Sequence, residues 1–173
     1  MKQLLLLPFL FITVISFGQT NNYSLEFDGQ DDYGYFPASS SIDSLYDFTF
    51  MLWFKTNDVT IVKQSLISKD TLNPQPNGDC DITLSNDKVQ FYIKQSTNPT
   101  GTAQTNTSIL DSTWYHFAVT RNGSTGLVNM YVNGAYDTGF VGYSGIMQNK
   151  KPYYFGRYSS LSIWFLNGNM DDV

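Results

Sequence analysis

One stretch, residues 114–134, constrains the fold more than any other because it reads as a complete β-hairpin. Apolar and polar side chains alternate in its first half, with Phe117 and Val119 on one face, and again in its second half, with Val128 and Met130. For these faces to coincide, the pairing must place Phe117 opposite Met130 and Val119 opposite Val128. The stretch therefore predicts two antiparallel strands that share one buried face.

The turns of this hairpin follow from the same register. A polar loop, residues 122–125, closes the two strands, and His116 is expected across from Tyr131 on the outer face. The second strand then ends at Asn133-Gly134, a pair typical of a two-residue turn in which both central residues have positive φ.

Residues 114–134 resemble the signature hairpin of the laminin-G-like jelly roll, a branch of the concanavalin A-like lectin/glucanase sandwiches. Four other segments resemble that family in the right order: its opening strand and turn, its Trp-bearing strand, the next strand and the start of its closing strand, at residues 25–37, 48–56, 66–70 and 166–173. The resemblance implies an all-β fold, a two-sheet antiparallel jelly-roll sandwich. The family's closing strand continues past the Asp-Val pair at which this chain stops, so the C-terminal strand is interpreted as truncated and the chain as a fragment or a truncated reading frame.

The first residues have the layout of a secretory signal peptide. Lys2 precedes an apolar run, residues 4–15, which is followed by the small residues Ser16 and Gly18. The run is shorter than the roughly 18 apolar residues that a membrane span requires, which disfavours a membrane anchor. We expect cleavage before Gln19, so that residues 1–18 are removed and residues 19–173 form one secreted or cell-surface domain.

The composition argues against nucleic acid as a partner and excludes a disulfide within the chain. The chain is acidic, with a formal net charge of −5, and its 10 Lys and Arg form no basic stripe, so nucleic acid is not an expected partner. Cys80 is the only cysteine, so no disulfide can form within the chain. We expect Cys80 to be a small buried hydrophobe rather than a reactive thiol.

Further strands can be placed between the recognisable segments. Residues 48–56 carry apolar side chains on both faces, including Met51 and Trp53 on the second face, which predicts a strand central to its sheet. Residues 80–84 and 89–94 are expected to pair as a hairpin. The polar segment 96–108 is interpreted as a solvated loop or weak edge strand in preference to a ligand-binding rim loop.

Glycoside hydrolysis is the enzymatic hypothesis to be weighed, because the same sandwich hosts retaining glucanases whose catalytic strand carries two glutamates. Glu26 is the only glutamate of this chain, and it lies in the opening strand in an unlike context. Asp171 and Asp172 are adjacent in a strand and therefore point to opposite faces. His116 is the only histidine, and a structural role in the sheet is the preferred interpretation. We expect no enzymatic activity.

Calcium is the predicted cofactor, in a structural role. Asp28 lies with Asp31 and Asp32 in an acidic turn near the start, and Asp171 lies near the end. The family resemblance implies that the first and last strands are neighbours, which would bring Asp28 and Asp171 together. Carboxylate and carbonyl oxygens suit calcium. The alternative is that the aspartates serve turn geometry alone.

Sugar binding is the activity that the resemblance implies most directly, through aromatic rings that stack on pyranose faces. Tyr131, Tyr143, Tyr158 and Trp164 are the candidates, and the alternative for each is packing in the core or at an edge. The sequence thus predicts a secreted, non-catalytic module of a larger surface or adhesion protein that binds a glycan or an extracellular protein. The alternatives are a targeting module of a carbohydrate-active enzyme and a structural spacer.

Overall fold

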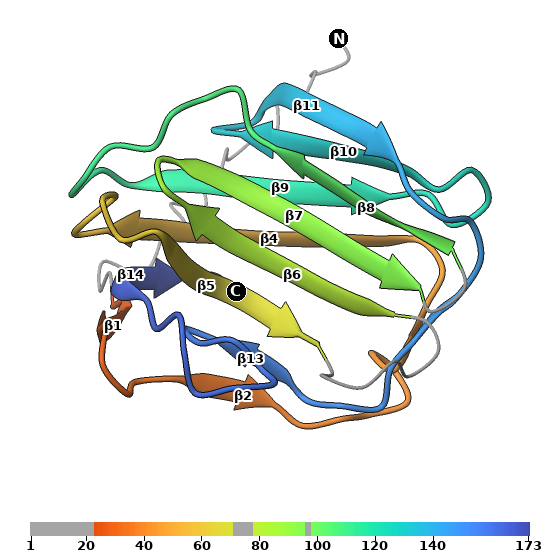
Figure 1. The fold of residues 1–173 in the computed structure, drawn as a ribbon, viewed down its shortest axis with the longest axis horizontal. Helices are drawn as coiled ribbons and strands as arrows, with labels where there is room; N and C mark the ends of the chain where they lie inside the picture. The colour runs from red at the N-terminus through yellow and green to blue at the C-terminus, as the bar shows by residue number, and fades with distance from the viewer. Residues whose placement is uncertain (1–22, 71–77, 96–97) are drawn as a thin grey trace, which may run out of the picture.

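The computed structural model of the chain describes residues 23–70, 78–95 and 98–173, and these form a sandwich of two antiparallel sheets (Figure 1). We call the rear layer in that view sheet I. It has the strand order β1-β14-β4-β9-β10-β11. The strands of sheet I are β1 (Leu25–Asp28), β14 (Asn167–Asp171), β4 (Phe48–Thr56), β9 (Tyr115–Arg121), β10 (Leu127–Val132) and β11 (Ala135–Val141).

The front layer, sheet II, has the order β2-β13-β5-β6-β7-β8. Its strands are β2 (Gly34–Phe36), β13 (Tyr153–Phe155), β5 (Lys63–Lys69), β6 (Asp79–Ser85), β7 (Lys88–Gln95) and β8 (Asn98–Gln104). A small third sheet pairs β3 (Ser44–Leu45) with β12 (Met147–Gln148). The predicted jelly-roll sandwich is confirmed, and polar segment 96–108 supplies the edge strand β8.

The core lies between the two sheets and follows the alternation in the sequence. Sheet I contributes Phe54 and Phe117, and sheet II contributes Leu66, Ile82 and Phe91, all with 0–1% of their surface exposed. Full burial of side chains of this size is worth about 1.5–3 kcal/mol each. Cys80 is buried in the same core, as expected, and burial raises the pKa of its thiol to about 12, which keeps it protonated and unreactive.

The signature hairpin has the predicted buried face but not the predicted register. Phe117, Val119, Val128 and Met130 are all fully buried, yet Met130 pairs with Val119 and Val128 pairs with Arg121. The shift is two residues, and a two-residue shift leaves every side chain on the same face.

The cause of the shift is the loop between β9 and β10. It includes Gly126, whose φ of 71° allows the backbone amide of Asn122 to bond the carbonyl of Leu127 at 2.9 Å. The loop therefore closes later in the sequence than predicted, and His116 is not across from Tyr131. The second turn is confirmed, with positive φ at both Asn133 and Gly134.

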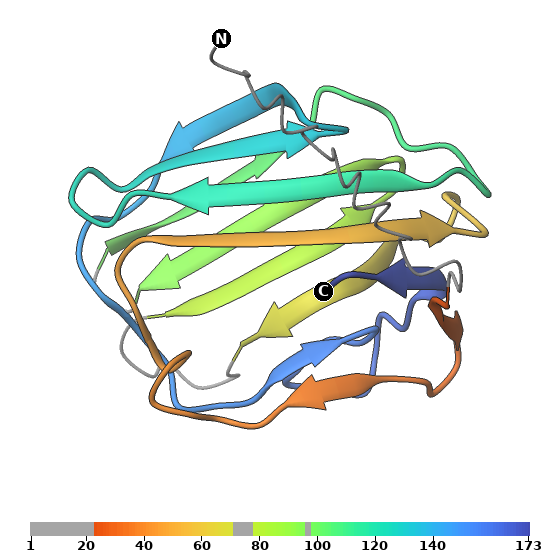
Figure 2. The same ribbon diagram turned by 180° about the vertical axis from the view of Figure 1, so that it is seen from behind.

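Strand β4 is central in sheet I, between β14 and β9, as its sequence predicts. Its second face is not covered, however, because Met51 and Trp53 are 57% and 41% exposed. The apolar residues on that face therefore line the outer surface of the sandwich (Figure 2 shows this sheet from behind).

The predicted signal peptide, residues 1–18, lies outside the described residues. Within the described ranges no helix is long and apolar enough to cross a membrane.

Candidate functional site: a tryptophan-lined hollow on sheet I

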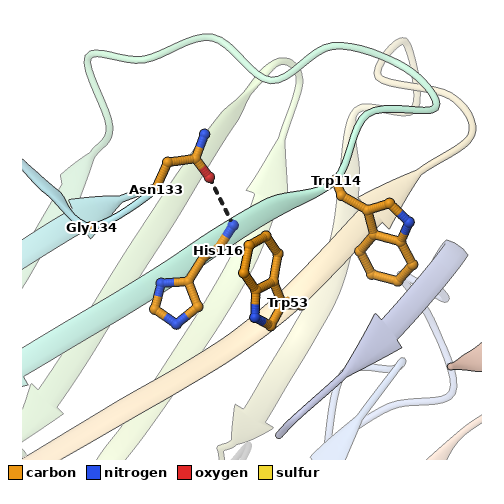
Figure 3. Close-up of a pocket in the computed structure, with 5 residues that line it drawn as sticks. All are labelled: Trp53, Trp114, His116, Asn133 and Gly134. Carbon is orange, nitrogen blue, oxygen red and sulfur yellow. Dashed lines mark hydrogen bonds between the residues drawn. The ribbon is translucent and has the colours of Figure 1, made fainter. Parts of the chain in front are cut away.

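A hollow of about 550 Å³ lies on the outer surface of sheet I (Figure 3). It is lined by Trp53, Trp114, His116, Asn133 and Gly134. We call it the tryptophan hollow. Its lining comes from β4, from β9 and the residue just before it, and from the turn that follows β10.

The register of sheet I places these side chains together. Trp53 is the cross-strand partner of His116, and their ring centroids lie 5.2 Å apart at an interplanar angle of 61°. The neighbours of Trp53 in β4, Leu52 and Phe54, point into the core and are fully buried. Period-two alternation therefore forces the indole of Trp53 outward.

The Asn133-Gly134 turn closes one side of the hollow. The side-chain oxygen of Asn133 accepts the backbone amide of His116 at 2.9 Å, and the amide of Asn133 donates to the carbonyl of His116 at 2.8 Å. These two bonds hold the turn against β9 (Figure 3). Because the Asn133 oxygen is engaged, its NH₂ group is the part that can donate to a ligand.

The two indole rings keep a large part of their surface accessible. Trp53 is 41% and Trp114 is 38% exposed, and the ammonium of Lys55 lies 5.5 Å from the centre of the Trp114 ring. The lining joins flat apolar rings to a few hydrogen-bonding groups and contains no carboxylate. This chemistry suits a ring-shaped ligand that carries hydroxyl groups, and it offers no acid–base pair for hydrolysis.

The aromatic residues proposed from the sequence do not form one platform. Tyr131 lies on β10, next to Ala118 of β9 on the outer face of sheet I, where its ring contacts Tyr136. Tyr143 is only 5% exposed and packs on the guanidinium of Arg121, so it is a core residue. The pKa of Tyr143 is raised, chiefly by burial.

Tyr158 and Trp164 lie in a different place, the loop between β13 and β14. Their rings are neighbours, with centroids 4.5 Å apart. Tyr158 is 8% exposed and donates its hydroxyl to Asp70 at 2.5 Å, and the ammonium of Lys63 lies 4.1 Å from the Trp164 ring. Both are therefore engaged in holding their own loop. Tyr158 and Trp164 lie in a connection between strands, whereas Tyr131 lies on β10 of sheet I.

The predicted calcium residues are also separated. Strands β1 and β14 are neighbours, as the resemblance implies, but Asp28 pairs with Asn167. Asp171 lies four residues further along β14, about 13 Å away at the rise of a strand, and pairs with Trp53. The expectation that Asp28 and Asp171 converge is therefore wrong.

The acidic turn itself does bring its three carboxylates together. Oxygens of Asp28, Asp31 and Asp32 lie within 4.8 Å of one another, and all three residues are exposed. They also serve the turn: Asp28 accepts the amide of Gln30 at 2.8 Å, and Asp32 accepts the amide of Asp28 at 3.1 Å. Turn geometry thus accounts for part of this cluster.

A second cluster of polar groups lies under residues 157–164. Asp81 of β6 accepts the hydroxyl of Ser68 at 2.5 Å, and the amide of Ser159 donates to the Ser68 oxygen at 3.0 Å. Burial, opposed by the hydrogen bond from Ser68 and aided by the neighbouring carboxylate of Asp70, raises the pKa of Asp81 to about 8. Asp81 is therefore largely protonated at neutral pH.

Sequence reasoning named Trp53 and His116 but did not group them, or Trp114, as a site. The sequence does contain a signal, which is the alternation of side chains along each strand. Trp53 lies between the buried residues Leu52 and Phe54 and therefore points outward, and Trp114 lies two residues before His116 and therefore shares its face. Grouping them also requires knowing that β4 pairs with β9, and that pairing joins residues more than sixty positions apart.

The comparisons with known proteins agree with this fold. The family model of the concanavalin A-like lectin/glucanases superfamily, of the laminin G type, matches residues 28–173. The chain belongs to this superfamily. Among curated proteins no match is found.

Solved structures of this superfamily's fold are similar over most of the chain at low sequence identity. The LG1-3 region of the laminin alpha2 chain has a TM-score of 0.68 and 16% identity and covers 86% of this chain, which spans only 30% of that structure. The CBM40 of a Ruminococcus gnavus sialidase, bound to sialyllactose, has a TM-score of 0.62 and 13% identity, with 86% and 90% of the two chains covered. Domain 4 of an extracellular arabinanase from Geobacillus stearothermophilus, in complex with arabinotriose, has a TM-score of 0.62 and 17% identity, with 86% and 67% covered. These likenesses establish the sandwich fold.

Proposed function

We propose that this chain is a secreted, non-catalytic module that binds a neutral glycan in the tryptophan hollow, as one part of a larger surface or adhesion protein. The observation that carries the proposal is the pair of exposed indoles, Trp53 and Trp114, beside the imidazole of His116 and the amide of Asn133. Indole faces stack on the C–H face of a pyranose, and the polar groups select hydroxyl positions.

The fold neighbours support a binding role. Two of them were solved with a bound saccharide, one with sialyllactose and one with arabinotriose. The laminin neighbour leaves an extracellular protein as the competing ligand class. Secretion rests on the layout of residues 1–18.

A second function is favoured by the origin of these neighbours. The arabinotriose-binding domain belongs to a GH43 arabinanase, and the CBM40 belongs to a sialidase. The chain would then be the targeting module of a carbohydrate-active enzyme. The sequence of the full gene product separates the two: a hydrolase domain supports targeting, whereas repeated sandwich modules or a surface-sorting segment support adhesion.

The test of glycan binding uses the change in tryptophan fluorescence and isothermal titration calorimetry with neutral oligosaccharides such as arabinotriose and cellotriose. We expect at least one to bind, and Trp53→Ala or Trp114→Ala to weaken binding about tenfold, which corresponds to about 1.4 kcal/mol. Met51→Ala is the matched control, because Met51 is exposed on the same face but does not line the hollow.

Equal affinity of the parent chain and both tryptophan variants would contradict the proposed site. Sustained release of reducing ends from the same oligosaccharides, lost on Glu26→Gln, would contradict the non-catalytic assignment. Trp164→Phe removes the one tryptophan that lies outside the hollow and makes the fluorescence signal specific to the site.

A further inference from the structure

A second aromatic surface lies at the β2 edge of sheet II, on the opposite layer of the sandwich from the tryptophan hollow. Tyr35 of β2 and Tyr154 of β13 are cross-strand partners, and Tyr33 immediately precedes β2. The Tyr154 ring lies 5.9 Å from both the Tyr33 and the Tyr35 ring. We call Tyr33, Tyr35 and Tyr154 the tyrosine platform. Two of its rings are largely accessible, since Tyr33 is 50% and Tyr35 is 57% exposed.

A guanidinium group is held against this platform. The Cζ atom of Arg157 lies 4.1 Å from the centre of the Tyr33 ring and 4.3 Å from that of Tyr154. One Nη atom donates to the hydroxyl of Ser162 at 2.9 Å. These contacts fix the direction of the side chain before any ligand arrives, which lowers the entropic cost of binding.

The charge of Arg157 is not neutralised by the surrounding protein. The one ion pair between described residues joins Lys69 to Asp43, so no carboxylate of the described chain lies within 4 Å of Arg157. Its Nε is buried without a hydrogen-bond partner among those residues. A guanidinium has five N–H donors, and within the described ranges the bond to Ser162 is the one hydrogen bond that engages them.

We propose that Arg157 and the tyrosine platform form a second saccharide-binding site, which takes a sugar that carries a carboxylate. The planar N–H donors of a guanidinium match the two oxygens of a carboxylate, and such charge-assisted pairs are about twice as strong as neutral hydrogen bonds. The exposed rings of Tyr33 and Tyr35 supply the flat apolar surface on which a pyranose stacks. Neither feature alone selects an acidic sugar, but the two side by side do.

The acidic turn near the platform does not remove this preference. Asp31 and Asp32 immediately precede Tyr33, but Asp32 accepts the backbone amide of Asp28 within its own turn, and neither residue pairs with Arg157. Coulomb attraction falls with distance, so carboxylates that are not in contact with Arg157 act on it more weakly than a carboxylate in direct contact would. The direct contact between Arg157 and the ligand carboxylate therefore makes binding of an acidic sugar favourable, while the carboxylates of the turn reduce the strength of that attraction.

The experiment compares three probes on the full chain by isothermal titration calorimetry: trigalacturonic acid, its methyl ester and inorganic sulfate. The ester keeps the rings and removes the charge, and sulfate keeps a charge and lacks the rings. We expect the acid to bind at least tenfold more tightly than either. Arg157→Gln should abolish that difference. Arg157→Lys should retain only part of it, because an ammonium group lacks the planar pair of N–H donors that bonds both oxygens of a carboxylate. Lys151→Gln, which removes an exposed charge outside the platform, should change nothing.

Tyr35→Ala provides a second variant that leaves Arg157 in place. We expect it to weaken binding of the acid and to leave thermal unfolding close to that of the parent chain, because Tyr35 is mostly exposed. Equal binding of acid and ester, or of acid and sulfate, would overturn the proposal, as would an Arg157→Gln variant that folds and binds like the parent. Trp53→Ala should leave binding of the acid intact, so failure of the tryptophan hollow and failure of this site are distinguishable.

Discussion

Phe117 and Thr120 lie in the same strand but on opposite faces of sheet I, and they show what a single position can contribute. Phe117 is fully buried between the sheets, whereas Thr120 pairs with Thr49 of β4 on the outer face, where it is partly exposed. Removal of a buried phenyl ring leaves a cavity as well as a lost transfer free energy. The two substitutions therefore separate core packing from surface contacts.

We expect Phe117→Ala to lower the free energy of unfolding by about 3–5 kcal/mol and Thr120→Ala to lower it by well under half of that. Urea titration followed by circular dichroism measures both. Comparable small losses at the two positions would show that the assigned buried face is wrong.

Calcium binding remains a prediction, and it now concerns the acidic turn alone. Asp28, Asp31 and Asp32 hold three carboxylates within 4.8 Å, so a cation that binds them relieves their mutual repulsion. We expect calcium to raise the melting temperature with increasing concentration, and Asp31→Asn to remove that shift. Asp171→Asn is the control, because Asp171 lies away from the turn. Identical melting of the parent in calcium and in EDTA would leave the aspartates with turn geometry as their only role.

At the scale of elements, the alternation of side chains along the strands predicted which face is buried, but it did not predict the register between strands. The buried face of the β9–β10 hairpin is confirmed, because inward and outward directions follow from period two alone. The register is wrong because the loop before β10 closes between Asn122 and Leu127, one residue later than predicted, and the positive φ of Gly126 in that loop cannot be read from the sequence. The tryptophan hollow and the Arg157 site escape sequence reasoning for a related reason: each needs partners from strands distant in sequence.

The loop of residues 157–164 illustrates how a connection without regular structure is fixed. Ser159 receives and donates several bonds: its hydroxyl accepts the amide of Asp70 at 2.6 Å and donates to the carbonyl of Asp70 at 3.0 Å. Ser160 donates to the same carbonyl at 2.6 Å. These bonds join the loop to the end of β5, next to the protonated carboxyl of Asp81.

This arrangement predicts a pH dependence of stability. The unfolded chain releases the Asp81 proton near pH 4, whereas the folded chain holds it until about pH 8. The contribution of the Asp81 proton to the stability of the folded chain is therefore complete below about pH 4 and is lost progressively as the pH rises to 8. The free energy of unfolding falls over this range by at most about 1.4 kcal/mol per pH unit. We expect Asp81→Asn to remove this slope in urea titrations between pH 5 and 8. Asp172→Asn, at an exposed position, should keep it; equal slopes in the parent and Asp81→Asn would contradict the buried protonated state.

At the scale of the whole molecule, the two proposed sites lie on the outer faces of different sheets. The tryptophan hollow uses β4 and β9 of sheet I, and the Arg157 site uses β2 and β13 of sheet II. The shared core holds both sheets in place, so ligand binding at one site requires no conformational change at the other. A module built in this way can hold two different sugars, or two parts of one polymer, independently.

The position of β14 has a consequence for how such a chain is made. β14 lies between β1 and β4, so residues near the two ends of the described chain pair inside one sheet. While the chain is being synthesised, β4 keeps one unpaired edge until residues 167–171 have left the ribosome, and unpaired edges favour aggregation. Most of the sandwich can assemble earlier, but sheet I is complete only once β14 has inserted between β1 and β4.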